Sequence, residues 1–218
     1  MTVLSLSEVE ALALKAARGA GLDWGLAEEA AFATRWLVEQ AIDGPALLAG
    51  HLDRMAAATH ATGTIVISES LWASAYADPL CPLALGAALG DHFDLPHGPV
   101  QRAISLSHVA TPALILPFLA QAAGRSGVVV TVDWAGTRVL LSDLTLLAVS
   151  GAEGLVAAAA TSVTVTAMPK WRRAGGLASR AEVSDATADG LNRLVFRTYV
   201  PASDQSRRDA GAVGTDNL

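Results

Sequence analysis

Apolar residues recur at helical spacing through the first 60 residues of the chain. In SLSEVEALALKAARGAG, Ser5 and Glu8 form a capping-box pattern ahead of an apolar stripe, and Gly19 or Gly21 supplies a stop. A second segment, WGLAEEAAFATRWLVEQA, carries another stripe, and a third, DGPALLAGHLDRMAAA, begins with a proline suited to a first helical turn. The pattern predicts a helical layer over residues 5 to about 60.

Beyond Gly63 the pattern changes to short runs rich in β-branched residues, which are typical of strands. TIVIS is one such run, and GVVVTVDWAGTRVLLSD contains two more around a turn at Ala135 and Gly136, which predicts a hairpin. TSVTVTAMP alternates apolar and polar positions and ends at Pro169, as a half-buried strand would. We therefore expect a sheet with a central hairpin in the middle of the chain.

Helical patterns lie between and after these runs. CPLALGAALGDHF, TPALILPFLAQAAG and SDATADGLNRLVFRTYV each predict a helix, and the last must end before Pro201. Helices gather at the start and hairpin strands in the middle, so the predicted fold is α+β, with a helical layer packed on a mixed or antiparallel sheet. We expect a single domain over residues 1–218, with a mixed α+β part from about 61 to 200 and an ordered C-terminal tail at 201–218.

Composition adds two expectations. The hydrophobic fraction is 52%, the mean hydropathy is +0.40 and only 17% of residues are charged, so some apolar surface must be covered, either in a homo-oligomer interface or simply within alanine-rich helices. The net charge is −6, yet the chain from Lys170 onward holds eight of the fifteen basic residues and six of the twenty-one acidic ones. An acidic body with a basic C-terminal part predicts self-docking or an anion site, and it argues against a nucleic-acid partner.

The expected location is the cytoplasm. The single cysteine, Cys81, excludes an internal disulfide and fits a reducing compartment, and the first residues lack the pattern of a signal peptide. The uncharged run 103–124 is long enough to cross a bilayer, but Pro112 and Pro117 argue against a span, so we expect no membrane partner.

Cys81 is also a candidate for a catalytic residue. It stands just before Pro82 at a predicted helix start, where the helix dipole lowers a thiol pKa and favours a nucleophile; the alternative is a buried, inert thiol. His51 is interpreted as a surface or core-edge residue. The cluster DHFDLPHG has no metal-ligand spacing and is read as a polar loop, so no metal site is predicted, and no motif identifies a cofactor.

The end of the chain carries the predicted ligand site. Arg197, Tyr199, Ser203, Ser206 and Arg207 combine planar cationic donors with hydroxyl groups, a set that suits a carboxylate or phosphate. These residues predict a protein or enzyme that binds an anionic metabolite. The alternative is a non-catalytic homo-oligomeric assembly protein whose tail docks on the acidic body or on another subunit.

The two ends of the sequence also carry a resemblance. With EVEALALKAARGAGLDWGLAEEAAFATRWL at one end and RTYVPASDQSRRDAGAVGTDNL at the other, the chain resembles an uncharacterised bacterial family of similar length, a domain of unknown function. It differs from that family near Val213, where the family is richer in glycine, and at Leu218, where the family has an acidic residue. The opening helices are weakly similar to those of the malate/L-lactate dehydrogenase family. The chain is shorter, however, and lacks that family's catalytic histidine in its context, so we attribute the similarity to shared helix chemistry and not to a shared function.

Overall fold

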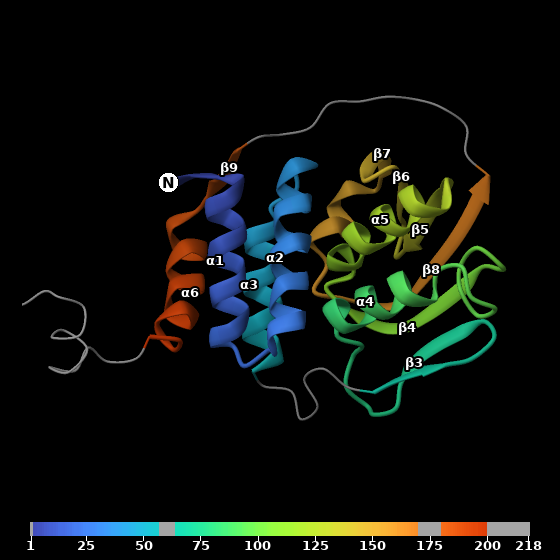
Figure 1. Cartoon of the computed structure of the whole chain (residues 1–218), viewed down its shortest axis with the longest axis horizontal. Helices are drawn as coiled ribbons and strands as arrows, with labels where there is room; N and C mark the ends of the chain where they lie inside the picture. The colour runs from blue at the N-terminus through green and yellow to red at the C-terminus, as the bar shows by residue number, and fades with distance from the viewer. Residues whose placement is uncertain (1, 57–63, 170–179, 200–218) are drawn as a thin grey trace, which may run out of the picture.

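Helices α6, α1, α3 and α2 stand side by side along one end of the molecule, beside a large sheet (Figure 1). The computed structural model describes residues 2–56, 64–169 and 180–199 of the chain. The helical layer comprises α1 (Leu6–Gly19), α2 (Trp24–Glu39), α3 (Gly44–Met55) and α6 (Asp185–Phe196). The α+β prediction is therefore confirmed, with the last helix joining the first three.

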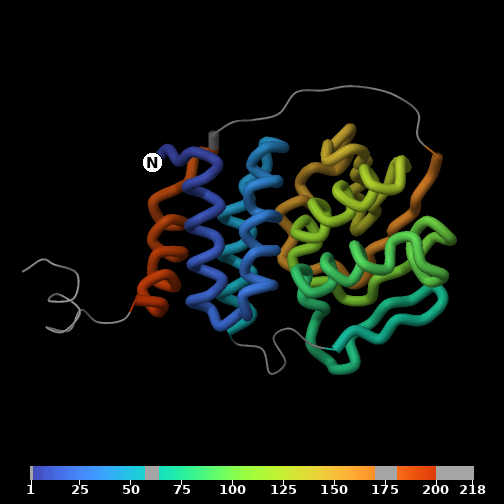
Figure 2. The backbone as a smooth tube through the Cα atoms, in the orientation of Figure 1, coloured from blue at the N-terminus to red at the C-terminus, as the bar shows by residue number. Residues whose placement is uncertain are grey.

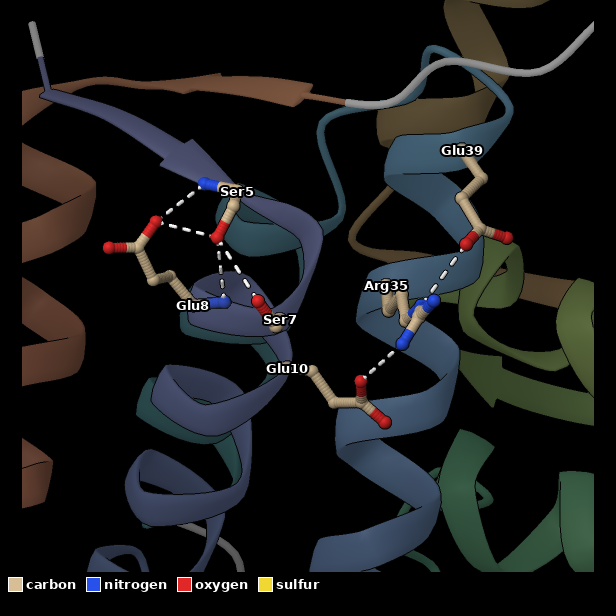
Figure 3. Close-up of polar contacts among 6 residues, drawn as sticks. All are labelled: Ser5, Ser7, Glu8, Glu10, Arg35 and Glu39. Atoms are coloured by element: carbon tan, nitrogen blue, oxygen red, sulfur yellow. Dashed lines mark hydrogen bonds and ion pairs between the residues drawn. The ribbon is translucent and has the colours of Figure 1, made fainter.

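Each helix of the layer starts where the sequence provides a cap. The capping box at Ser5 is confirmed: the Glu8 N–H donates to Ser5 Oγ at 3.3 Å, and the Ser5 N–H donates to Glu8 Oε2 at 2.7 Å (Figure 3). Asp23, Asp43 and Ser184 cap α2, α3 and α6 through the same side-chain geometry. These caps satisfy backbone N–H groups that the first helical turn leaves without partners.

Small residues allow the helices of the layer to pack closely. The shared core contains Ala13, Ala16 and Ala17 of α1 with Leu191 and Leu194 of α6, all at most 7% exposed. At Gly19 the approach is closest, because a Cβ there would overlap the backbone carbonyl of Leu194. The C-terminal ends of α1 and α6 therefore lie together, and the two helices run parallel (Figure 2).

The seven-stranded sheet has the order β2-β3-β4-β8-β5-β6-β7. Its strands are β2 (Ile65–Ile67), β3 (Leu71–Ser74), β4 (Ile104–Ala110), β5 (Val128–Trp134), β6 (Thr137–Ser142), β7 (Thr145–Ser150) and β8 (Ala159–Pro169). All neighbours pair antiparallel except β3 and β4, which are parallel, so the sheet is mixed. The predicted hairpin is confirmed as β5-β6, and its turn has φ of 42° at Ala135 and 83° at Gly136.

One face of this sheet is the core of the molecule. Trp72, Leu106 and Val163 face one another across three strands and are completely buried, and Val165, Val132 and Val139 continue the same face. Helices α4 (Pro82–His92) and α5 (Leu116–Ser126) belong to this side, together with the short 3-10 helix η1 (Pro112–Ile115). A second short helix, η2 (Ala152–Val156), joins β7 to β8.

A separate two-stranded ribbon links the two ends of the described chain. β1 (Thr2–Ser5) pairs antiparallel with β9 (Arg180–Val183), immediately before α1 and α6 respectively. Neither strand was expected from the sequence, and β3, β4 and β7 were not expected either. None of the helices that the structure describes combines the length and apolarity needed to span a lipid bilayer.

Candidate functional site

Cys81 lies at the start of α4, as expected, but inside the core. Its residue is 3% exposed, and its Sγ lies 3.7 Å from Nε2 of His51 on α3. Burial raises the pKa of the Cys81 thiol, and this outweighs the nearby backbone N–H groups of Leu83 and Ala84. The lowered pKa expected from the helix dipole is thus wrong in direction, because desolvation of the thiolate is the larger effect.

His51 is a core residue, and its interpretation as a surface or core-edge residue is wrong. It is 3% exposed, and burial, with a smaller contribution from the charge of Arg54, lowers its pKa to about 4. Its Nδ1 has no hydrogen-bond partner among the described residues. The thiol and the imidazole are therefore both uncharged at neutral pH, and a nucleophilic role for Cys81 stays a prediction that needs a conformation with less burial.

A second polar contact lies next to this pair. Arg54, one turn after His51 on α3, donates from Nη2 to Thr111 Oγ1 at 2.7 Å. Thr111 is 1% exposed and has a φ of 40°, in the left-handed region that side chains other than glycine rarely adopt. His51, Arg54, Cys81 and Thr111 therefore gather where α3, α4 and η1 meet, and they link the helical layer to the sheet.

An open hollow of about 490 Å³ lies on the other face of the sheet, at the β5-β6 turn. Its polar lining comes from four strands and includes Asp133 on β5, Arg138 on β6, Ser150 on β7, and Ser162 and Thr164 on β8. Strand register explains the grouping, because Asp133 pairs with both Arg138 and Thr164, and Arg138 pairs with Ser150. Because successive side chains of a strand point to opposite faces, these side chains point away from the buried face that carries Val132, Val163 and Val165.

The charged pair of this hollow is close and only partly exposed. Arg138 Nε donates to Asp133 Oδ1 at 2.6 Å, with 62% of the Arg138 side chain and 32% of the Asp133 side chain exposed. Among the described residues, Asp133 is the partner of this guanidinium, through Nε, so both Nη groups remain as donors. The hollow was not predicted from the sequence, although the alternation in TSVTVT and the hairpin turn together place these residues on one face.

The predicted tail site is only partly within the described residues. Arg197 and Tyr199 lie at the C-terminal end of α6, exposed, and the Tyr199 ring makes an edge contact with Phe196, with ring centroids 5.5 Å apart. Ser203, Ser206 and Arg207 lie outside the described residues, as does the whole predicted tail 201–218. The anion site at these five residues stays a prediction.

The DHFDLPHG cluster contributes structural contacts. His92 Nδ1 lies 3.0 Å from the Ala88 carbonyl oxygen, its ring packs edge-on against Trp72, and Ser126 Oγ donates to Asp94 at 2.8 Å. Within the described part of the chain, no group of three or more His, Cys, Asp or Glu residues is placed to hold a metal ion.

Comparison with known proteins bears on the N-terminal part of the chain. No curated protein matches the sequence. Residues 4–75, which run from β1 through the first three helices to β3, match a family described as "Protein of unknown function (DUF3726)". The resemblance to an uncharacterised family is thus confirmed over residues 4–75, where the chain is similar to the DUF3726 proteins.

Proposed function

We propose that the protein binds a small organic anion in the hollow at the β5-β6 turn, with Arg138 as the residue that holds the anionic group. The observation that carries this proposal is the guanidinium, tied through Nε to Asp133 and flanked by the hydroxyl groups of Ser150, Ser162 and Thr164. A hollow of about 490 Å³ matches the size of small-molecule sites, which span roughly 300 to 1,000 Å³. Arginine offers paired, planar donors to a carboxylate or phosphate.

Asp133 narrows the class of ligand. Its carboxylate lies within the same lining, so a bare anion would be repelled by Asp133 while Arg138 attracts it. A molecule that also carries a hydroxyl or ammonium group would donate to Asp133 while its carboxylate accepts from Arg138. Amino acids and hydroxy acids have this combination, and they are the ligands that the arrangement favours.

The hollow is built on rigid elements. Its residues stand on four adjacent strands, and the β5-β6 turn is braced by η2, where Trp134 Nε1 donates to the Gly154 carbonyl at 3.0 Å and Thr137 Oγ1 donates to the Gly151 carbonyl at 2.7 Å. Rigid strands lower the entropy cost of binding, because little ordering remains for the ligand to impose. A reducing compartment such as the cytoplasm is the expected setting, since the chain carries one cysteine, a free and buried thiol.

Thermal shift and saturation-transfer NMR against a panel of amino acids, hydroxy acids, simple dicarboxylates and neutral sugars test this proposal. Arg138→Lys keeps the charge but removes the paired donors, so we expect ligand affinity to fall about tenfold or more. The matched control is Arg102→Lys. This change alters another exposed arginine, which does not line the hollow and whose Nη1 lies 3.1 Å from Glu69 Oε2.

Two results would overturn the proposal. One is a panel in which only neutral sugars bind, because that would exclude an anionic ligand. The other is a ligand whose affinity is unchanged by Arg138→Lys, or is reduced equally by Arg102→Lys, because either would place its site elsewhere.

A further inference from the structure

The outer side of α1 and α6 carries a graded charge pattern that the ligand hollow does not explain. Near the N-terminal ends of both helices lies a groove of about 350 Å³ whose lining includes Glu8 and Asp189, with Leu4, Leu12 and Ala188 as apolar members. Figure 3 shows the Glu8 carboxylate on the side of α1 that faces α6, whereas Glu10 points the other way, toward Arg35 of α2. The acidic groups therefore gather at one end of this face.

The C-terminal half of the same face is basic and aromatic. Along α6, the groove residues Asp189 and Asn192 are followed at helical spacing by Phe196, and Tyr199 lies just beyond the helix with its ring centroid 5.5 Å from that of Phe196. Phe196 and Tyr199 are 68% and 55% exposed. Exposed Arg193 lies one turn after Asp189, and Arg197 follows after another turn. Lys15, seven residues after Glu8 on α1, is also exposed at this end.

We infer that this α1-α6 face binds the same face of a second copy of the chain, in an antiparallel, two-fold symmetric dimer. The occupant follows from charge complementarity, because reversing the direction of the second copy brings each acidic end opposite a basic end. A two-fold axis near Asn192 places Ala188 opposite Phe196 of the second copy and Asp189 beside Arg193 of the second copy. The exposed Phe196 ring then covers the apolar floor of the opposite groove.

Helix direction supports the same arrangement. α1 and α6 run parallel within one chain, so their dipoles add rather than cancel (Figure 2). In an antiparallel dimer the helices of the two copies oppose one another, and the dipoles compensate. The parallel alternative would bring carboxylates against carboxylates and arginines against arginines.

Sedimentation velocity and light scattering over a range of concentrations test the dimer with charge reversals. Asp189→Lys places lysines beside arginines, and Arg193→Glu places glutamates beside aspartates, so each variant is expected to weaken dimerisation about tenfold or more. An equimolar mixture of the two variants is expected to restore the dimer, because the heterodimer pairs lysine with glutamate and arginine with aspartate. Far-UV circular dichroism checks that each variant is folded.

The matched control is Glu153→Lys, a charge reversal at an exposed position of η2 in the sheet half of the molecule. It should leave the dimerisation constant unchanged. A wild type that stays monomeric at high micromolar concentration would overturn the inference. A dimer that persists unchanged in both single variants, or that the mixture fails to restore, would also overturn it.

Discussion

Replacement of Gly19 by alanine should separate α6 from α1. A Cβ at position 19 would overlap the Leu194 carbonyl oxygen and carbon and would lie 3.2 Å from the Leu194 Cα. Backbone atoms cannot rotate away as a side chain can, so α6 must shift. Overpacking of this kind typically costs about 1–3 kcal/mol, and the better helix propensity of alanine offsets less than about 1 kcal/mol of this cost. For a chain of 218 residues, we expect the Tm to fall by about 2–10 °C.

The measurements are thermal unfolding, which gives the Tm, and urea unfolding, both followed by circular dichroism, with Gly90→Ala as the matched control. Gly90 is also a helical glycine, in α4, but a Cβ there would meet only Arg125 Nη2 at 3.8 Å. The stability of Gly90→Ala should therefore equal or slightly exceed that of the wild type. Limited proteolysis provides a second reading, since a displaced α6 should be cut faster. A Gly19→Ala protein as stable as the wild type would refute the close contact between the two helices.

Three further predictions concern titratable groups. The pKa of His51 is lowered from 6.5 to about 4, so on acidification the unfolded state takes up a proton before the folded state does. Between pH 7 and pH 4 this difference should lower the free energy of unfolding by about 3 kcal/mol. His51→Leu should therefore show a shallower pH dependence of stability in urea titrations. Burial, followed by the charges of Asp91 and Glu28, raises the pKa of Glu29, so its charged form opposes folding above that pKa. Glu29→Gln should therefore raise the urea midpoint at pH 7 but not near pH 3, and a loss of stability at pH 7 would contradict this reasoning. The Cys81 thiol should react with a disulfide reagent only as fast as the protein opens, and immediate labelling of the native protein would disprove its burial.

Local signals in the sequence were sufficient to predict most of the helices. The Ser5 capping box, the proline at the start of α3 and the alanine stripes act over three or four residues, so they can be read without knowledge of the fold. The β5-β6 turn was predictable for the same reason, because Gly136 tolerates a positive φ.

The missed strands depend on longer-range pairing. β4 was read as part of an apolar run, although Ser105 and Ser107 alternate with buried Ile104 and Leu106. β1 and β9 are four residues each and exist because they pair with one another across the length of the chain.

The contacts of the candidate sites could not be derived from spacing alone. His51 and Cys81 are 30 residues apart and meet only because α3 packs beside the start of α4. The hollow required the register of four strands, which the sequence does not specify. The predicted tail site rested on residue chemistry alone, and Arg197 and Tyr199 are the two of its five residues that the structure describes.

The helical layer is interrupted in sequence by the entire seven-stranded sheet, since α1 to α3 end at Met55 and α6 begins at Asp185. During synthesis on the ribosome, the face of α1 that carries Gly19 must therefore wait for more than half of the protein to emerge before Leu194 packs against it. A fragment limited to residues 4–75 would expose that face permanently. Such a fragment should aggregate unless a chaperone binds it, and adding a separate α6 peptide should restore its solubility.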